Sequence, residues 1–359
     1  MVYYIRFLKP PKFERKKVIT KSSRSQKTIF INALISITTD LGDDFLAQNV
    51  DLVATWVHGV SHGAVDQVSL QWQAGSRQLQ VSLGPFAEEK MSRHPAIVEI
   101  RPQDTKEDLL GTKSTPLVIS ACSAPFKWQS DPAEKLILRN LRIQDTGSKL
   151  KIWEETGNSI ARHIWDAALA SIIFLNEIIA GKDTSMPALS HLLRTPREKL
   201  LQAVELGAGC GIVGIALATM LDSCQVILTD LPEVEEIVSR NISHAHLMPS
   251  SSITYKNLDW EDPPPNLCSQ PIDLILVSDC TYNADSLPTL VSALDRLVRD
   301  SPEALVLVAL KRRHESEAIF FDLMRSASFF SVQTKVQLPT QHEEFDQIEL
   351  HCYSHKLAV

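Results

Sequence analysis

The chain has 359 residues, of which 44% are hydrophobic and 22% are charged, and its formal net charge at pH 7 is −7. This composition predicts a soluble, globular protein with one large core, or one core with a smaller appended domain. It disfavours a membrane protein and a secreted one, because no window approaches the roughly 20 consecutive apolar residues of a membrane span and no apolar segment follows the basic start. We therefore expect no membrane partner and a cytoplasmic location, with the nucleus as an alternative.

The charge is unevenly distributed along the chain. Residues 1–30 hold nine basic side chains and one acidic side chain, Glu14, so this segment has a net charge of +8 and the remainder one of −15. Residues 1–42 are predicted to be a basic, disordered tail, because apolar periodicity is scarce up to about Ser25. A mitochondrial transit peptide is the alternative, which the lack of an amphipathic stripe disfavours. The acidic body disfavours a nucleic-acid partner.

Residues 43–135 are predicted to form an N-terminal β-containing region. Alternating apolar residues over Val65–Trp72 and Leu79–Leu83 flank a glycine-bearing loop, which predicts a hairpin. Further strands are expected near 116–121 and 135–143. No catalytic constellation occurs there, so we interpret this region as a packing cap or a platform for partner recognition.

The rest of the chain alternates between strand and helix patterns. After a short strand at 150–154, a helix is predicted from a cap at Asn158 to Ile179, closed by Gly181, with a polar loop over 182–199. Apolar runs then predict strands at 201–206, 225–229, 253–258, 272–278 and 304–310, separated by helices near 212–221, 233–246, 286–299 and 314–326. Two last strands, 329–338 and 345–352, would form an antiparallel hairpin at the sheet edge. The pattern predicts a Rossmann-like α/β fold: a mostly parallel, seven-stranded sheet with helices on both faces.

A glycine-rich turn follows the strand at 201–206. It does not match the dinucleotide fingerprint G-x-G-x-x-G, because the sixth position counted from Gly207 is Ile212. The spacing E-L-G-x-G-x-G, which contains Gly207, Ala208 and Gly209, resembles motif one of the S-adenosylmethionine methyltransferases instead. A tight turn that binds no ligand is the alternative.

Acidic and aromatic side chains follow the next two strands. Asp230 ends the strand at 225–229, where a carboxylate can accept hydrogen bonds from ribose hydroxyls; helix capping is the alternative. Asp259 and Trp260 follow the strand at 253–258, where Asp259 can accept from an adenine amino group and Trp260 can pack beside the ring. A capping aspartate beside a core tryptophan is the alternative.

The fourth of these strands ends in Asp279-Cys280-Thr281-Tyr282. This D-x-x-Y sequence, together with an upstream E-x-T-G at Glu154–Gly157 and a W-D-A-A helix start at Trp165–Ala168, resembles the METTL-type protein lysine methyltransferase family of the seven-strand class, also called methyltransferase family sixteen. The resemblance covers roughly Leu136–Val359, which is the expected methyltransferase domain (136–359); residues 1–130 lie outside it.

The resemblance implies S-adenosylmethionine as the cofactor and a protein lysine as the methyl acceptor. The residues that it places against the cofactor are Trp165, Gly207, Ala208, Gly209, Asp230, Trp260 and Ser278, to which the position of Asp259 adds a further candidate. For Trp165, core packing is the alternative.

Methyl transfer requires a neutral lysine amine aligned with an already activated methyl group, and desolvation lowers the amine's pKa. Our hypothesis is that Asp279 accepts a hydrogen bond from the amine and that Tyr282 walls the pocket, neither acting as a strong base. Helix capping near Ala284 is the alternative for Asp279. The basic cluster Lys311–Arg313 is interpreted as solvated charges or as a contact for an acidic partner.

Two other functions compete with protein methylation. Small-molecule N-methylation would share the cofactor half, although the chain lacks the Asn/Asp-Pro-Pro-Tyr sequence of amide and nucleobase methyltransferases. A non-catalytic adaptor would show a damaged cofactor site, and here the motifs are intact. The six cysteines have no zinc spacing, so no metal is expected, and we expect a monomer.

Overall fold

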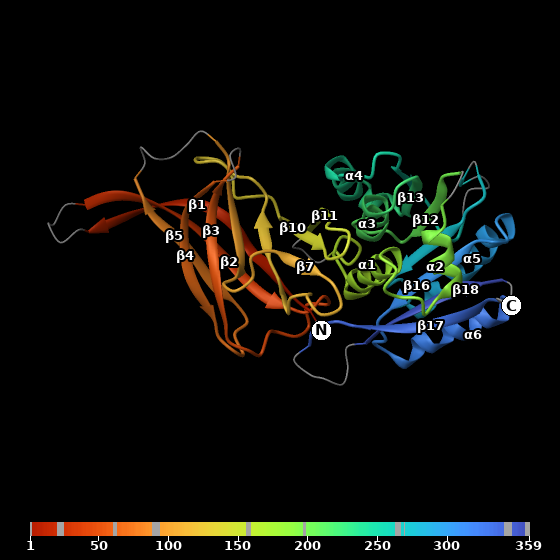
Figure 1. The fold of residues 1–359 in the computed structure, drawn as a ribbon. Helices are drawn as coiled ribbons and strands as arrows, with labels where there is room; N and C mark the ends of the chain where they lie inside the picture. Colours follow the sequence, from red (N-terminus) through yellow and green to blue (C-terminus); the bar gives the residue numbers. More distant parts are fainter. Residues whose placement is uncertain are drawn as a thin grey trace.

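The computed structural model describes residues 2–19, 25–59, 63–87, 94–155, 159–196, 199–262, 267–268, 270–340 and 347–355. These residues form an elongated molecule in which an N-terminal all-β part lies beside a C-terminal α/β part (Figure 1). The chain passes from one part to the other through β10 (Leu136–Ile143), β11 (Lys149–Glu155) and α1 (Asp166–Ile179).

The basic N-terminal segment is folded, which corrects the prediction of a disordered tail over residues 1–42. Its two long strands, β1 (Tyr3–Ile19) and β2 (Ser25–Thr38), pair antiparallel. Every second residue of the inner part of β2 is a buried apolar residue, namely Ile29, Ile31, Ala33, Ile35 and Ile37. This period of two is that of a strand with one face in a core. The density of basic side chains concealed the pattern.

The N-terminal part contains two sheets. One has the strand order β5-β2-β1-β8, and the other has the order β11-β10-β9-β6-β3-β4, with β7 paired to β10. The other strands of this part are β3 (Val50–His58), β4 (Ala64–Trp72), β5 (Leu79–Phe86), β6 (Ala96–Pro102), β7 (Asp108–Leu110), β8 (Val118–Ile119) and β9 (Ala121–Ser123).

Strands β4 and β5 exist as predicted, but the hairpin predicted between them is wrong. β4 pairs with β3 and β5 pairs with β2, so the connection between them crosses from one sheet to the other. Trp72 at the end of β4 is fully buried, and its indole Nε1 donates to the carbonyl of Leu46 at 2.9 Å. An alternating pattern identifies a strand and its buried face, but it does not identify the partner strand.

The predicted boundary between residues 135 and 136 divides a continuous sheet between β9 and β10. β10, which the sequence assigned to the methyltransferase domain, pairs with β9 on one side and β11 on the other. The first two strands of that domain therefore complete the N-terminal sheet.

The C-terminal part contains a mostly parallel sheet of seven strands in the order β14-β13-β12-β15-β16-β18-β17. Its first five strands pair in parallel, whereas β18 is antiparallel to both β16 and β17. The predicted α/β class, parallel sheet and antiparallel edge hairpin are confirmed. The strands are β12 (Leu201–Leu206), β13 (Cys224–Asp230), β14 (Ser252–Asn257), β15 (Leu274–Ser278), β16 (Leu305–Leu310), β17 (Phe330–Gln337) and β18 (Gln347–Ser354).

The helices between these strands follow the predicted order. They are α3 (Ile212–Met220), α4 (Glu235–His244), α5 (Leu287–Asp300) and α6 (Ile319–Ser326), of which the last three continue from the short 3-10 turns η2 (Pro232–Val234), η3 (Ala284–Ser286) and η4 (Glu315–Ala318). The segment predicted as a polar loop, 182–199, contains a further helix, α2 (Pro187–Arg194), which buries Leu189 and Leu193.

Helix α1 is shorter than predicted at its start. It begins at Asp166, and Ile160 upstream of it is 55% exposed. The predicted cap Asn158 lies outside the described residues. At the other end, Gly181 has a φ of +74° and donates its N–H to the carbonyl of Ile178, as the sequence predicted for a helix-closing glycine.

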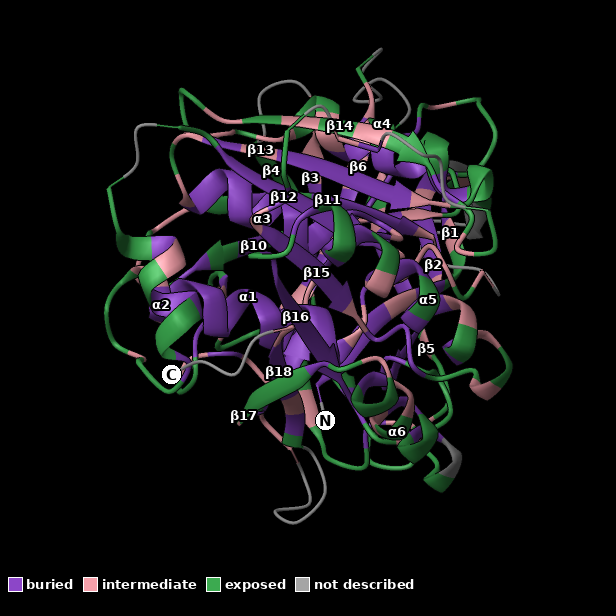
Figure 2. Ribbon diagram, turned by 90° about the vertical axis from the view of Figure 1, so that its right-hand side faces the viewer, coloured by how far each residue is buried: buried purple, intermediate pink, exposed green. Residues whose placement is uncertain are grey.

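Buried side chains run through both parts of the molecule (Figure 2). In β15, Leu274 and Leu276 belong to one apolar cluster, whereas Ile275 and Val277 belong to a second. Since successive side chains of a strand point to opposite faces, the two clusters lie on opposite faces of the sheet.

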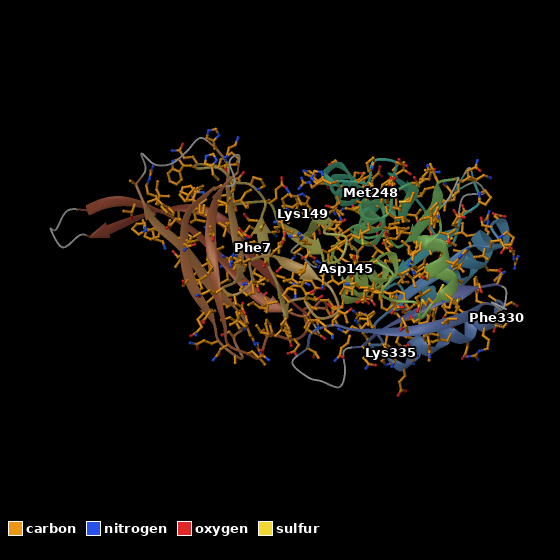
Figure 3. The ribbon with its side chains drawn as sticks, viewed as in Figure 1. Phe7, Asp145, Lys149, Met248, Phe330 and Lys335 are labelled. Atoms are coloured by element: carbon orange, nitrogen blue, oxygen red, sulfur yellow. The ribbon has the colours of Figure 1, made fainter. Side chains whose placement is uncertain are left out.

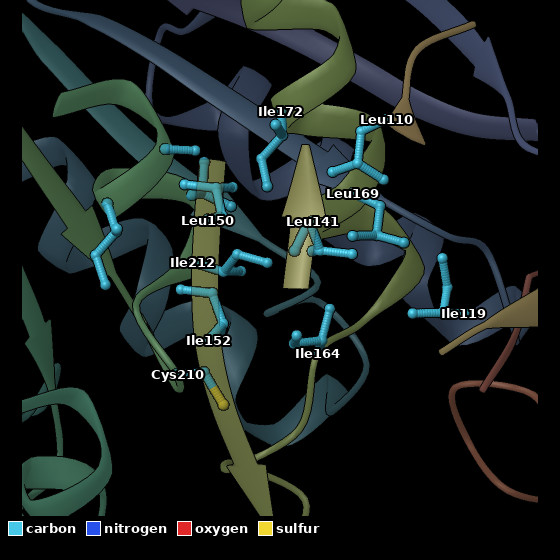
Figure 4. Close-up of a cluster of buried hydrophobic side chains, with 14 of the residues drawn as sticks. Leu110, Ile119, Leu141, Leu150, Ile152, Ile164, Leu169, Ile172, Cys210 and Ile212 are labelled. Atoms are coloured by element: carbon cyan, nitrogen blue, oxygen red, sulfur yellow. The ribbon is translucent and has the colours of Figure 1, made fainter. Parts of the chain in front are cut away.

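The two parts share the first of these clusters. Figure 4 shows Leu141 and Leu150 of the last two N-terminal strands close to Leu169 and Ile172 of α1 and to Ile212 of α3. Polar contacts extend this junction. Asp145, labelled in Figure 3, accepts a hydrogen bond from Asn176 of α1 at 2.9 Å and pairs with Lys182. Continuous burial of this kind makes the junction part of one core.

Among the described residues, no helix combines the length and the apolar character needed to cross a membrane. No cluster of three or more His, Cys, Asp and Glu side chains able to hold a metal ion occurs in the same residues.

Candidate functional site

The glycine turn after β12 is built for close approach. Gly207 and Gly209 have φ values of +62° and +54°, in the left-handed region that favours glycine. A Cβ added at Gly207 would lie 2.5 Å from Sγ of Cys280 and 3.3 Å from Cζ2 of Trp260, and one added at Gly209 would lie 2.6 Å from the carbonyl oxygen of Ala161. Neighbouring groups therefore pack so closely against both positions that only glycine fits them.

Asp230 stands at the carboxyl end of β13, beside this turn. Its Oδ2 accepts a hydrogen bond from the N–H of Gly209 at 2.8 Å, and its Oδ1 accepts one from the N–H of Leu231 at 2.7 Å. Burial raises the pKa of Asp230, against the lowering effect of these two bonds. The carboxylate is thus fixed onto the glycine turn, and no side chain caps the 3-10 turn that follows it.

Asp259 and Trp260 follow β14 and line the same cavity as the glycine turn. Oδ1 of Asp259 accepts a hydrogen bond from the N–H of Glu261 at 2.9 Å, which is the local bond of a turn. Trp260 is partly buried, and its ring approaches Gly207 as the distances above show.

Asp279, directly after β15, is held by an arginine. Nη1 of Arg313 donates to Oδ1 of Asp279 at 2.7 Å and Nη2 donates to Oδ2 at 2.8 Å, which is a bidentate ion pair. The Asp279 side chain is 3% exposed and its backbone φ is +55°. Burial raises the pKa of this carboxyl group, and the bonds and charge of Arg313 oppose that rise.

The geometry decides the capping alternative for Asp279. The 3-10 turn near Ala284 is capped by Asn283, whose Oδ1 accepts from the N–H of Asp285 at 3.1 Å, so Asp279 is not the cap. Tyr282 is 56% exposed and its ring contributes to the mouth of a cavity, not to the core.

All ten residues that the sequence singled out line one cavity of about 450 Å³. They are Trp165, Gly207, Ala208, Gly209, Asp230, Asp259, Trp260, Ser278, Asp279 and Tyr282. The cavity lies at the carboxyl ends of β12, β13, β14 and β15, where open α/β sheets bind their ligands.

The sequence reasoning missed several other residues of this region. His163 and Cys280 line the same cavity, and burial raises the pKa of the Cys280 thiol well above its usual range. His163 lies outside the motifs by which the site was found, and Cys280 occupies an unspecified position of the D-x-x-Y motif. Position alone, two residues before Trp165 and directly after Asp279, is the only signal in the sequence for them.

The prediction of solvated charges at Lys311–Arg313 is wrong for two of the three residues. Lys311 is buried, and its Nζ donates to Oδ2 of Asp166 at 3.0 Å. Arg313 holds Asp279, and its guanidinium carbon lies 5.2 Å from the ring centroid of Trp165. Arg312 alone stays exposed, where it pairs with Glu349. The chain turns inward after β16 because buried carboxylates attract these two cations.

Comparison with known proteins places the chain in a family. The sequence model of the lysine methyltransferase family matches residues 144–327. The chain is similar to a UPF0665 family protein of Schizosaccharomyces pombe, with 32% identity over 46% of this chain and 47% of that protein. It is also similar to the protein-lysine N-methyltransferase rrg1 of the same organism, with 29% identity over 37% of this chain and 46% of that protein.

A third relative is the protein N-lysine methyltransferase METTL21A of Mus musculus, with 29% identity over 48% of this chain and 69% of that protein. The chain thus spans about half the length of the first two relatives. The region matched by the family model contains all ten of the cavity residues named above.

Proposed function

This chain belongs to the lysine methyltransferase family, and from that premise we propose that it transfers methyl groups from S-adenosylmethionine to a lysine side chain of a protein. The family resemblance inferred from the motifs is thereby confirmed. The observation that carries the proposal is the convergence of the glycine turn, Asp230 and Asp279 on one cavity.

The glycine turn fits the cofactor because it lines the cavity with backbone that carries no side chain. An amino-acid moiety and a ribose would pack against this backbone, which glycine lets a ligand approach closely. Each oxygen of Asp230 accepts one backbone hydrogen bond, and a carboxylate oxygen has a second lone pair, so Asp230 would hold the ribose hydroxyls. Trp260 and Asp259 would hold the adenine, and Trp165 and Ser278 would complete the wall.

The methyl acceptor is proposed to reach the cavity beside Asp279 and Tyr282. S-adenosylmethionine supplies a methyl group that its sulfonium centre already activates. The protein has to present a neutral amine, exclude water and fix the direction of approach. Asp279 would accept a hydrogen bond from the lysine amine, and Tyr282 at the mouth would cover the lysine's aliphatic chain.

The ion pair with Arg313 suits this task. An unpaired buried carboxylate would favour the charged ammonium form of the lysine, which is not a nucleophile. Because the Arg313 guanidinium balances the charge of Asp279, the carboxylate can accept a hydrogen bond from the amine without strongly stabilising its protonated form. Asp279 therefore orients the amine and does not have to act as a base.

Acidic residues at the cavity support a cationic substrate. Besides Asp230 and Asp259, the lining includes Glu233, Glu261 and Asp285. A negative lining attracts the lysine as an ammonium ion during approach, and desolvation inside the cavity then favours loss of its proton.

The proposal includes the sheet arrangement expected of the seven-strand class, with helices on both faces. The division of alternate residues of β15 between two apolar clusters supports it, because the first cluster contains residues of α1 and α3 and the second contains residues of α5 and α6.

The test is labelling of a lysate from cells that lack this protein, using the purified chain and S-adenosylmethionine with an isotopically labelled methyl group. We expect mass spectrometry to find the label on a lysine of a discrete protein. The variant Asp279→Asn keeps the shape of the side chain, and we expect about 100-fold slower transfer, the scale of a misplaced reacting group, with unchanged affinity for the cofactor. Asp300→Asn, at the exposed end of α5, is the matched control.

The other outcomes select other functions. Label confined to small molecules would show a metabolite N-methyltransferase. Cofactor binding without any transfer would favour a non-catalytic adaptor, and equal transfer by Asp279→Asn and the wild type would contradict the role of this carboxylate.

A further inference from the structure

A buried carboxylate that follows the N-terminal strand β2, Asp40, contacts the methyltransferase site. It lies outside the region matched by the family model and is 2% exposed. Nη2 of Arg313, which lies 273 residues further along the chain, donates to Oδ2 of Asp40 at 2.8 Å. The same guanidinium nitrogen donates to Asp279, so Arg313 lies between the two carboxylates.

Asp40 also contacts the start of α1. Its Oδ2 accepts a hydrogen bond from the N–H of Asp166 at 3.2 Å, and its Oδ1 accepts one from the N–H of Leu41 at 2.8 Å. No side chain of α1 itself caps that helix, so Asp40 satisfies one of its free N–H groups. Trp165 directly precedes α1 and lines the cavity. Asp40 therefore bonds to the backbone next to Trp165, and it also bonds to Arg313, which holds Asp279.

The surrounding charges make this arrangement specific. Lys311 lies 3.8 Å from Asp40 and pairs with Asp166, which also accepts a hydrogen bond from the hydroxyl of Tyr4 in β1 at 2.9 Å. Three buried carboxylates thus share two cations. In such a group each partner is needed, since removing one leaves a buried charge uncompensated.

The backbone of Asp279 shows why a support is required. With a φ of +55°, this non-glycine residue occupies a conformation that persists only when its surroundings over-determine it. The two bonds from Arg313 hold its side chain. The Arg313 guanidinium is itself held by a bond to Asp40 and lies over the ring of Trp165. Asp40 is the second carboxylate that binds this fork.

We propose that Asp40 is a positioning residue of the methyl-transfer site, through which the N-terminal β part holds the Arg313 fork on the Asp279 carboxylate. The inference rests on the proposed function and goes beyond it, because it gives residues outside the methyltransferase family region a part in the reaction.

The test compares Asp40→Asn with the wild type in the full chain. We expect at least a tenfold lower kcat per molecule that binds S-adenosylmethionine, with the affinity for the cofactor and the KM for the protein substrate changed less than twofold. The number of cofactor sites per chain, measured by calorimetry, corrects for any molecules that do not fold. Asp44→Asn removes the same charge from an exposed position of the same loop, and we expect it to behave as the wild type.

A merely structural role would lower the number of binding-competent molecules and leave the kcat of the remainder unchanged, and that result would overturn the proposal. The route through Arg313 is tested by Arg313→Lys, which keeps the charge but loses the fork. When Arg313→Lys is already present, we expect Asp40→Asn to change kcat less than twofold. If Asp40→Asn lowers kcat by the same factor in the wild type and in Arg313→Lys, the effect does not pass through Arg313.

Failure of the proposed function has a separate signature. If the wild type transfers no methyl group, the contact between Asp40 and Asp279 through Arg313 can still be tested. The measurement is the urea unfolding free energy of Asp40→Asn, Asp279→Asn and the double variant. Non-additive changes in unfolding free energy would support coupling between the two carboxylates, and additive changes would refute it.

Discussion

Replacement of Gly207 by alanine tests the close approach at the glycine turn. The backbone φ of +62° costs an alanine about 1–2 kcal/mol, because its Cβ crowds the following carbonyl. The same Cβ would lie 2.5 Å from Sγ of Cys280, and an overpacked position of this kind costs about 1–3 kcal/mol more. We expect Gly207→Ala to lower the urea unfolding free energy by about 2–5 kcal/mol and to weaken S-adenosylmethionine binding in calorimetry by at least tenfold.

Gly75→Ala is the matched control. Gly75 has a φ of +80°, but nothing lies within 4 Å of the position of its Cβ, so only the conformational cost of about 1–2 kcal/mol applies and cofactor binding should not change. Adding Cys280→Ala to Gly207→Ala removes the nearer of the two contacts and should restore part of the lost stability. Equal losses from Gly207→Ala and Gly75→Ala, or no recovery in the double variant, would refute the steric argument.

Two further predictions concern buried charges. Burial raises the pKa of Glu205 to about 8 from its ordinary 4.5, so between these pH values the folded chain keeps a proton that the unfolded chain has lost, and stability should fall as the pH rises. In Glu205→Gln the urea midpoint should depend less on pH between about pH 5 and pH 9. An equally steep fall of the midpoint in the variant would contradict this. Arg139 and Glu154 form an ion pair whose side chains are both 0% exposed, so Arg139→Met should lower the unfolding free energy by about 3–5 kcal/mol, whereas Arg142→Met, which removes an exposed pair on the same strand, should cost at most about 1 kcal/mol.

The cavity could be predicted from the sequence because its parts are local to strand ends. The glycine turn, Asp230 and Asp279 each follow a recognisable apolar run, and the carboxyl ends of parallel strands meet at one edge of the sheet. Short-range rules are therefore sufficient to bring them together. The parallel sheet itself followed from the regular alternation of strand and helix patterns.

The partners of these residues could not be predicted in the same way. Arg313 has the sequence pattern of a basic cluster at a helix start, but in the structure it bonds to Asp279 and to Asp40, which is 273 residues away in the chain. The pairing of β1 with β2 was not predicted, for a different reason. Basic side chains dominate the composition of this segment, while its buried residues occupy only alternate positions. For Arg313 a long-range contact is involved that the local sequence does not record, whereas for β2 the strand pattern is present in the sequence but was outweighed by the basic composition.

The same long-range contacts show that the N-terminal part is structurally continuous with the site. Glu154, the first residue of the upstream family motif, accepts hydrogen bonds from Nε of Arg139 at 2.7 Å and from the N–H of Ile164 at 2.9 Å. It thereby joins β10 of the N-terminal sheet to the segment that leads into α1 and Trp165. Asp40, in the loop after β2, bonds to the same stretch through the N–H of Asp166. Because Glu154 and Asp40 both bond to the chain that enters α1, a shift of the N-terminal sheets would displace a wall of the cavity.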